Sequence, residues 1–236
     1  MIIDNYLPRC IAHRGASQLK TENTIAALKA AAKAGATWVE FDIQLSADEK
    51  VMVYHDEWLM RLCRMPLRLS QLTQQHLQSI DKGAFSNHAD LRIASFKHWI
   101  KTAATLNMGI NIEIKSIDKV DLLMLKTLDL LKSYWPSHLP RPLISSFDAT
   151  LLEGLSAWRT TATGGDSDYS FDIALLLDRW PEKKLPRLLS DSDCYSVHLN
   201  KNIANAQRVT QLMELGKRVA CYTVNDREKA QQLFDI

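Results

Sequence analysis

Acidic and apolar side chains alternate in two short segments, and these segments carry the clearest chemical signal of the sequence. Glu40 and Asp42 alternate with apolar residues in the first segment, and Glu113 and Lys115 do so in the second. Because successive side chains of a β-strand point to opposite faces, each pair shares one face of its strand. Three carboxylates brought together repel one another unless a cation joins them or some are protonated. Lys115 neutralises one charge, and Mg²⁺ or Ca²⁺ suits the remaining oxygen ligands better than Zn²⁺.

The same alternation also occurs on the exposed face of an antiparallel sheet, so the carboxylates alone leave two interpretations open. Two histidines favour a catalytic site over an exposed sheet face, because His13 and His55 each end an expected strand and precede a charged residue. Imidazole titrates near neutral pH, so one ring can remove a proton while the other donates one. Arg14 offers a fork of donors that fits a phosphate group. Together these residue types describe phosphate-ester chemistry. His198 fits a place at the same site and a structural role equally well.

Short apolar strands alternate with helical stretches almost from end to end, which predicts a parallel α/β sheet. The expected strands are 10–15, 37–45, 51–56, 109–115, 142–147, 172–178, 195–200 and 218–225. The expected helices are 24–35, 96–106, 120–134, 151–158, 205–215 and 226–234. Eight strands favour closure into a TIM (β/α)8 barrel, which keeps its active site at the C-terminal ends of its strands. An open doubly wound sheet fits the alternation too.

Two places break this rhythm. The polar segment 46–50, between the second and third expected strands, is too short for a helix, so these strands could pair as a hairpin. The stretch 57–95 is irregular and contains Pro66, and we expect it to be a small insertion with short helices after the third strand. The length suits one domain, so we expect residues 1–236 to form a single barrel.

Composition excludes several classes of protein. The formal net charge is +2, from 29 basic and 27 acidic residues, and no basic stripe indicates a nucleic-acid partner. The four cysteines form no CxxC pair, and we expect buried, reduced thiols. The N-terminus does not resemble a signal peptide, and no apolar run approaches the length of a membrane span. We therefore expect a cytoplasmic protein without stable membrane insertion, whose oligomeric state the sequence leaves open.

At the residues singled out above, the sequence resembles the glycerophosphodiester phosphodiesterase family, and it looks most like the bacterial cytosolic members. The motifs are, in order, Ala12-His13-Arg14-Gly15, Glu22-Asn23-Thr24, Glu40-Phe41-Asp42, His55-Asp56, Glu113-Ile114-Lys115 and Tyr222-Thr223-Val224-Asn225. The likeness extends from about Cys10 to Asn225. A single motif of this kind would be weak, but six in register are specific.

The resemblance implies a metal-dependent hydrolase on a TIM barrel, with a small insertion after the His-Asp strand. The implied site residues are Glu40, Asp42 and Glu113 as metal ligands, with Glu22 as a further contributor; His13 and His55 as the acid/base pair; and Arg14, Lys115 and Tyr222 as substrate contacts. The implied substrates are deacylated phospholipids such as glycerophosphocholine and glycerophosphoethanolamine. The implied products are glycerol 3-phosphate and an alcohol, formed through a cyclic phosphate.

The sequence departs from the family pattern at three places. Thr21 stands where proline is common, which loosens a loop without removing a ligand, and Tyr222 stands where many members have tryptophan. Members usually continue past the last helix into an apolar run and a Thr-Asp pair. Since this chain stops at Ile236, we expect its natural C-terminus to extend further.

Three other functions remain as alternatives. Lys115 at a strand end permits a lyase or isomerase that forms a Schiff base, although the carboxylates would then be unexplained. A non-catalytic barrel that only binds a phosphoester is disfavoured because every candidate catalytic residue is present. A lysophospholipase D would need an apolar opening near the site. Trp58, Leu59, Met60 and Leu62 could provide that opening or could pack the insertion onto the barrel.

Overall fold

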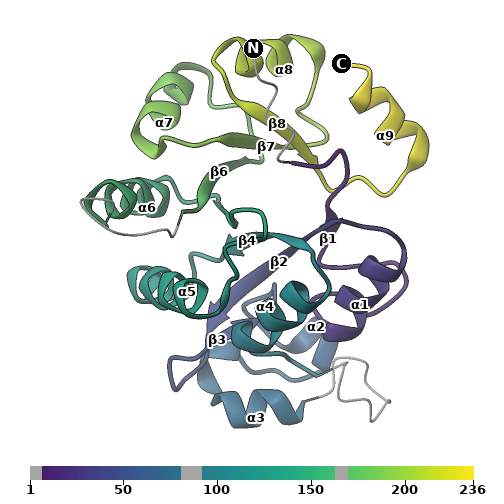
Figure 1. The fold of residues 1–236 in the computed structure, drawn as a ribbon, viewed down its shortest axis with the longest axis vertical. Coiled ribbons are helices and arrows are strands. Elements are labelled where there is room, and N and C mark those ends of the chain that lie inside the picture. Colours follow the sequence, from purple (N-terminus) through teal and green to yellow (C-terminus); the bar gives the residue numbers. More distant parts are fainter. Residues whose placement is uncertain (1–6, 81–91, 163–169) are drawn as a thin grey trace. The chain divides into compact units, whose positions relative to one another are not determined.

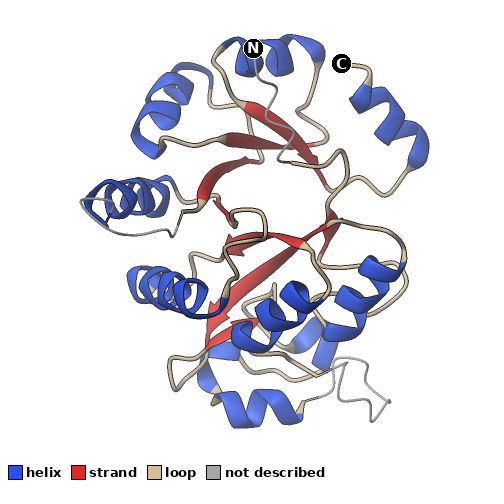
Figure 2. Cartoon of the chain, viewed as in Figure 1, coloured by secondary structure: helices blue, strands red, loops and turns tan. Residues whose placement is uncertain are grey.

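The computed structural model describes residues 7–80, 92–162 and 170–236. The chain divides into two compact units, Met1–Pro142 and Leu143–Ile236, and each is described by itself. In both units strands alternate with helices along the chain (Figures 1 and 2). Among the described residues, no helix combines the length and the apolar character that crossing a bilayer requires.

The described residues of the first unit form three parallel strands, one short antiparallel strand and the helices that follow them. Its elements are β1 (Ala12–His13), α1 (Ile25–Lys33), β2 (Trp38–Leu45), β3 (Val51–Val53), α2 (Met60–Cys63), η1 (Leu69–Gln71), α3 (Gln74–Ser79), α4 (Phe96–Thr105), β4 (Gly109–Ile114) and α5 (Val120–Tyr134). Strands β1 and β4 pair in parallel with the two edges of β2. This parallel ladder confirms the alternation predicted for this half of the chain.

Strand β3 pairs antiparallel with the end of β2, which confirms the hairpin alternative. It ends at Val53 and not at Asp56 as expected. The physical reason is the buried side chain of Gln44, whose Nε2 donates to the backbone carbonyls of Tyr54, His55 and Asp56 at 2.8–3.0 Å. Because these carbonyls face the Gln44 amide and not a neighbouring strand, the strand ladder ends here and the backbone turns toward the insertion.

The second unit contains four parallel strands in sequence order. Its elements are β5 (Leu143–Ser146), α6 (Ala149–Ala162), β6 (Asp172–Leu177), η3 (Glu182–Lys184), α7 (Leu185–Ser192), β7 (Ser196–Asn200), α8 (Ala206–Glu214), β8 (Arg218–Tyr222) and α9 (Arg227–Phe234). Strand β6 pairs with β5 and β7, and β7 pairs with β8. Helix α7 was not expected from the sequence. All the helices that were expected are present, with ends that differ by a few residues.

The core of the first unit explains why β2 and α4 pack together. The apolar face of β2 carries Phe41, whose ring lies 4.9 Å from the ring of Trp99 and 5.9 Å from that of Phe96. Ser95 caps the start of α4 by accepting a hydrogen bond from the backbone of His98, which satisfies a donor that the helix cannot. The apolar face of β2 thus packs on a helix, as the alternation predicts, and its polar face is left for the site.

The described part of the insertion carries short helices, as expected. Helices α2 and α3 and the turn η1 enclose a cluster of fully buried side chains: Met52, Tyr54, Leu59, Leu69, Leu77 and Ile93. Leu59 therefore packs the insertion, whereas Trp58 and Met60 are exposed by 44% and 51%. The cysteines are all free, but Cys10 is exposed while Cys194 is buried, so the expectation of a buried thiol is wrong for Cys10.

Candidate active site

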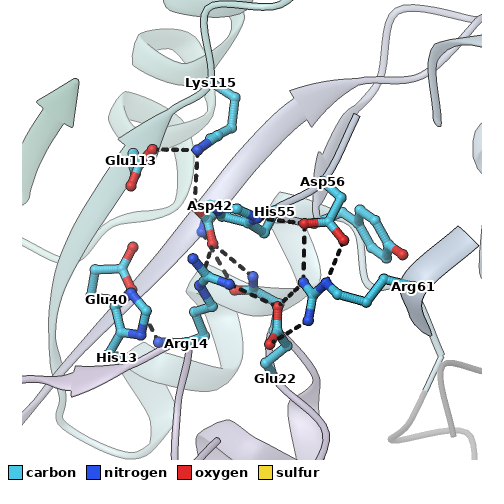
Figure 3. A network of polar contacts seen from close by, with 12 residues as sticks. His13, Arg14, Glu22, Glu40, Asp42, His55, Asp56, Arg61, Glu113 and Lys115 are labelled. Atoms are coloured by element: carbon cyan, nitrogen blue, oxygen red, sulfur yellow. Dashed lines mark hydrogen bonds and ion pairs between the residues drawn. The ribbon is translucent and has the colours of Figure 1, made fainter. Parts of the chain in front are cut away.

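Three neighbouring strands bring the predicted site residues together through their register. In the parallel pairing, His13 of β1 lies beside Glu40 of β2, and Asp42 of β2 lies beside Glu113 of β4. Alternation along β2 then places Glu40 and Asp42 on the same face. Residues far apart in the sequence therefore meet on adjacent strands, as Figure 3 shows.

Glu40, Asp42 and Glu113 form a buried group of carboxylates. Each offers an oxygen atom within 4.8 Å of the other two, and their exposed fractions are only 7%, 0% and 8%. Oε1 of Glu40 and Oδ1 of Asp42 are buried and accept no hydrogen bond. Buried polar atoms are normally satisfied, and leaving one unpaired is costly. An all-oxygen donor set with unfilled acceptor sites fits a hard divalent cation such as Mg²⁺ or Ca²⁺.

Burial and mutual repulsion raise the pKa values of two of the three carboxyl groups. Burial raises the pKa of Glu40, and the negative charges of Asp42 and Glu113 raise it further. Burial is also the main reason why the pKa of Glu113 rises, followed by the charge of Asp42, while Lys115 opposes the rise. A metal ion needs the ionised carboxylates, so its binding would release protons from this group.

Two cationic side chains face the triad, as the sequence predicted. Nζ of Lys115 lies 2.6 Å from Oε1 of Glu113 and 3.8 Å from Oδ1 of Asp42. Nε of Arg14 lies 3.3 Å from Oδ2 of Asp42. Asn23, to which sequence reasoning gave no role, donates from Nδ2 to the same oxygen at 2.8 Å. Its left-handed backbone, with φ of 55°, is one that asparagine adopts readily.

The two histidines flank this arrangement. Nε2 of His13 lies 3.7 Å from Oε2 of Glu40, the oxygen that also accepts the backbone N–H of Arg14 at 3.0 Å. Burial, followed by the charge of Arg14, lowers the pKa of His13 to about 4. Nδ1 of His55 lies 2.6 Å from Oδ1 of Asp56. Because an ionised carboxylate only accepts, Nδ1 carries the hydrogen and Nε2 is left to exchange a proton.

Glu22 lies beside the triad and not within the group of three. Its Oε1 accepts hydrogen bonds from Nη1 of Arg14 at 3.0 Å and from Nη2 of Arg61 at 2.7 Å. Its Oε2 accepts one from Nη1 of Arg61 at 3.0 Å. Burial would raise the pKa of Glu22, but the hydrogen bonds from Arg61 and Arg14 outweigh it and the pKa falls to about 2. Arg61 is a residue that sequence reasoning missed, since it lies in the insertion and at no strand end.

Tyr222 lies in the second unit at the end of β8. Its hydroxyl donates to Oδ1 of Asp178 at 2.9 Å, and its ring meets that of Phe147 edge to face with centroids 6.0 Å apart. The predicted contact between Tyr222 and glycerol stays a prediction. His198 is 95% buried on β7, within 3.1 Å of the hydroxyl of Ser196, which favours the structural role for this histidine.

A cleft of about 500 Å³ opens beside His55. Its lining includes His55, Trp58, Met60, Arg61, Lys115 and Ile117. The charged groups of the lining are engaged in ion pairs: Asp56 with Arg61, and Lys115 with Glu113. The surface left for a bound group is therefore largely apolar and comes from Trp58, Met60 and Ile117.

The sequence profile of the glycerophosphoryl diester phosphodiesterase family matches residues 13–236. The chain belongs to this family. Among solved structures, this family member is similar to a phosphodiesterase of Oleispira antarctica in complex with the product sn-glycerol-3-phosphate. The two are 27% identical, the match covers 98% of this chain and 90% of that one, and the TM-score is 0.86. This likeness confirms the predicted fold class, a TIM barrel.

Two curated relatives match parts of this glycerophosphodiester phosphodiesterase family member. A glycerophosphodiester phosphodiesterase of Caldanaerobacter subterraneus is 35% identical over 108 residues, which cover 45% of this chain and 44% of that protein. A lysophospholipase D of Homo sapiens is 33% identical over 142 residues, which cover 57% of this chain and 44% of that protein. The chain thus spans less than half the length of these curated relatives.

Proposed function

We propose that this chain hydrolyses glycerophosphodiesters to glycerol 3-phosphate and an alcohol, with the aid of a divalent cation, Mg²⁺ or Ca²⁺. The observation that carries the proposal is the buried triad Glu40, Asp42 and Glu113 beside two histidines. The family match supports the reaction class, and the product bound to the Oleispira antarctica relative supports the substrate class.

The carboxylates of Glu40, Asp42 and Glu113 would hold the cation. When bound, it would neutralise the phosphoryl oxygens of the substrate and the repulsion within the triad. Arg14 and Lys115 hold the substrate phosphate, because each already places a charged nitrogen at the edge of the triad. Glu22 keeps Arg14 in place, and its contribution to the metal site would require Arg14 or Arg61 to move away.

The two histidines carry the proton transfers. One ring removes the proton of a glycerol hydroxyl, whose oxygen attacks phosphorus, and the other ring protonates the oxygen of the leaving alcohol. This step leaves a cyclic phosphate. Water then opens the cyclic phosphate with the roles of the histidines reversed. This step restores the protonation state of both imidazoles and gives glycerol 3-phosphate. Tyr222 packs against the glycerol in this proposal.

A second substrate class, the lysophospholipids, is favoured by one observation. The cleft beside His55 exposes Trp58, Met60 and Ile117, and apolar surface of this kind suits an acyl chain better than a small polar alcohol. The lysophospholipase D of Homo sapiens among the relatives supports the same alternative. Trp58→Ala is expected to reduce turnover of lysophosphatidylcholine more than turnover of glycerophosphocholine; equal losses would contradict this class.

The Schiff-base alternative is disfavoured by the surroundings of Lys115. Burial alone would lower the pKa of Lys115, but Glu113 and Asp42 outweigh burial and raise it. A nucleophilic amine must be neutral, and this site stabilises the charged form. A cytoplasmic location is a further part of the proposal, supported by the free cysteines, and so is a single domain over residues 1–236.

The decisive experiment measures release of glycerol 3-phosphate from a panel of glycerophosphodiesters. We expect activity with Mg²⁺ or Ca²⁺, loss of activity after stringent chelation, and recovery when either ion is returned. The panel includes glycerophosphocholine, glycerophosphoethanolamine and lysophosphatidylcholine. Because lysophosphatidylcholine gives choline and lysophosphatidic acid and no glycerol 3-phosphate, choline release is measured in parallel, and this separates the two substrate classes. Full activity in the chelated protein, or no release from any member of the panel, would overturn the proposal.

A further inference from the structure

Arg61 makes the most extensive side-chain contacts of the described insertion. Its Nε and Nη2 donate to Oδ2 and Oδ1 of Asp56 at 2.6 and 3.0 Å. Its Nη1 and Nη2 donate to Oε2 and Oε1 of Glu22 at 3.0 and 2.7 Å. Each edge of the planar guanidinium therefore engages one complete carboxylate (Figure 3). Only arginine has the donor geometry for two such forks, because lysine carries a single ammonium group.

Asp56 connects Arg61 to a residue with a proposed role in the reaction. Its Oδ1 accepts both NH2 of Arg61 and Nδ1 of His55, the latter at 2.6 Å. Fixing Asp56 therefore fixes the orientation of the imidazole and keeps the hydrogen on Nδ1, so that Nε2 is the nitrogen available to substrate. An outer residue that holds a functional histidine in this way commonly affects activity by about 10- to 100-fold.

Glu22 anchors the other edge of the same guanidinium. It lies on the loop between β1 and α1, and it also accepts from Arg14 at 3.0 Å. Arg61 is thus held between the loop that follows His13 and the segment that carries His55. Hydrogen bonds connect Glu22, Arg61, Asp56 and His55 without a gap, and each of these bonds involves at least one charged group.

A purely structural role for Arg61 explains less of the geometry. Its side chain is 47% exposed, and exposed ion pairs contribute little to stability. The insertion is held instead by its buried cluster, to which Leu59 and Leu69 belong and Arg61 does not. Arg68 offers a comparison within the same insertion, since it is 44% exposed, pairs with a single carboxylate, that of Glu57 at 2.8 Å, and places its guanidinium over the ring of Trp58.

We propose that Arg61 is a positioning residue that holds the imidazole of His55 through Asp56, with Glu22 as its anchor. This inference rests on the proposed hydrolase function, because His55 is an acid/base residue only there. It does not require Arg61 to touch the substrate. It predicts that the insertion, besides lining the cleft, controls the geometry of one of the two proton-transfer groups.

The test compares Arg61→Ala, Arg61→Lys and the control Arg68→Ala in the complete, metal-supplemented protein with glycerophosphocholine. We expect Arg61→Ala to lower kcat by about 10- to 100-fold with little change in KM, and Arg61→Lys to recover only part of it. Free guanidinium at millimolar concentration should partly rescue Arg61→Ala. Arg68→Ala should keep its kcat within about twofold. Normal kcat in Arg61→Ala, or an equal loss in Arg68→Ala, would overturn the inference.

A second measurement separates this inference from the proposed function. Nitrogen-15 spectra of the His55 ring report which nitrogen carries the hydrogen, and they need no substrate. At a pH where the ring is neutral, we expect hydrogen on Nδ1 in the unsubstituted protein and a mixture of tautomers in Arg61→Ala and Arg61→Lys. An unchanged tautomer in both variants refutes the positioning role. An inactive unsubstituted protein whose tautomer responds to Arg61 refutes only the hydrolase function.

Discussion

His198 is a buried titratable group that the proposed chemistry does not use, and it makes acid stability measurable at one residue. Burial lowers its pKa from 6.5 to about 4, so the folded protein keeps this ring neutral at pH values where the unfolded chain protonates it. Between these two values the unfolded state binds more protons. The free energy of unfolding therefore falls as the pH falls through this window.

The magnitude follows from the two pKa values. A shift of one unit corresponds to about 1.4 kcal/mol, so the full window is worth about 3 kcal/mol. Between about pH 7.5 and about pH 5 the loss amounts to roughly 2 kcal/mol. His198→Gln removes the titration but keeps a side-chain oxygen that can accept from Ser196. His13, whose pKa is also about 4, titrates in both proteins and cancels in the comparison.

Urea unfolding of the protein and of His198→Gln over this pH range checks the prediction. We expect the stability of His198→Gln relative to the unsubstituted protein to improve by roughly 2 kcal/mol as the pH is lowered. Turnover at neutral pH should stay within about twofold, because the proposed chemistry does not use this ring. A stability difference that is constant with pH would show that His198 is not kept neutral by burial. A large loss of turnover would show that His198 takes part in the reaction or in substrate binding.

Three further predictions concern the site and the strands that support it. Asp42→Asn should abolish the thermal stabilisation by Mg²⁺ or Ca²⁺ and lower turnover by about 100-fold or more; a retained shift in Tm would contradict the metal site. His13→Ala and His55→Ala should each lower kcat by about 10²- to 10⁴-fold with an unchanged circular dichroism spectrum, and near-normal kcat in either would defeat its assignment. Gly109→Ala should destabilise by about 1–3 kcal/mol in denaturant unfolding, because a Cβ atom would lie 2.2 Å from the Trp38 ring. This loss should shrink when Trp38 is replaced by leucine, and an equal loss would exclude the clash.

The carboxylate site was predictable because it depends on a local rule and a regular ladder. Alternation within β2 fixes that Glu40 and Asp42 share a face, whatever the rest of the chain does. The parallel register with β4 then places Glu113 beside Asp42, and parallel strands in such folds keep their functional residues at their carboxyl ends. The resemblance of six motifs to one family gave the same residues independently.

The insertion network was not predictable from the same rules. Arg61 lies on a helix of a single turn, and nothing in its neighbourhood shows that its side chain reaches Glu22, 39 residues earlier in the sequence. Helix α7 was not predicted from the sequence for a different reason. It is only eight residues long, no side chain caps its start, and its start signal is limited to Pro186 in its first turn. Tertiary contacts decide both features, and no local pattern reports them.

The hairpin formed by β2 and β3 separates two tasks that the reaction needs. The proposed metal ligands belong to the parallel ladder. His55 lies on the segment after β3, outside the ladder, where its backbone carbonyl accepts a hydrogen bond from the Gln44 amide. Changes in the length or composition of the insertion can therefore alter the position of His55 and the shape of the cleft, while the three carboxylates of the proposed metal site keep their places on the parallel ladder.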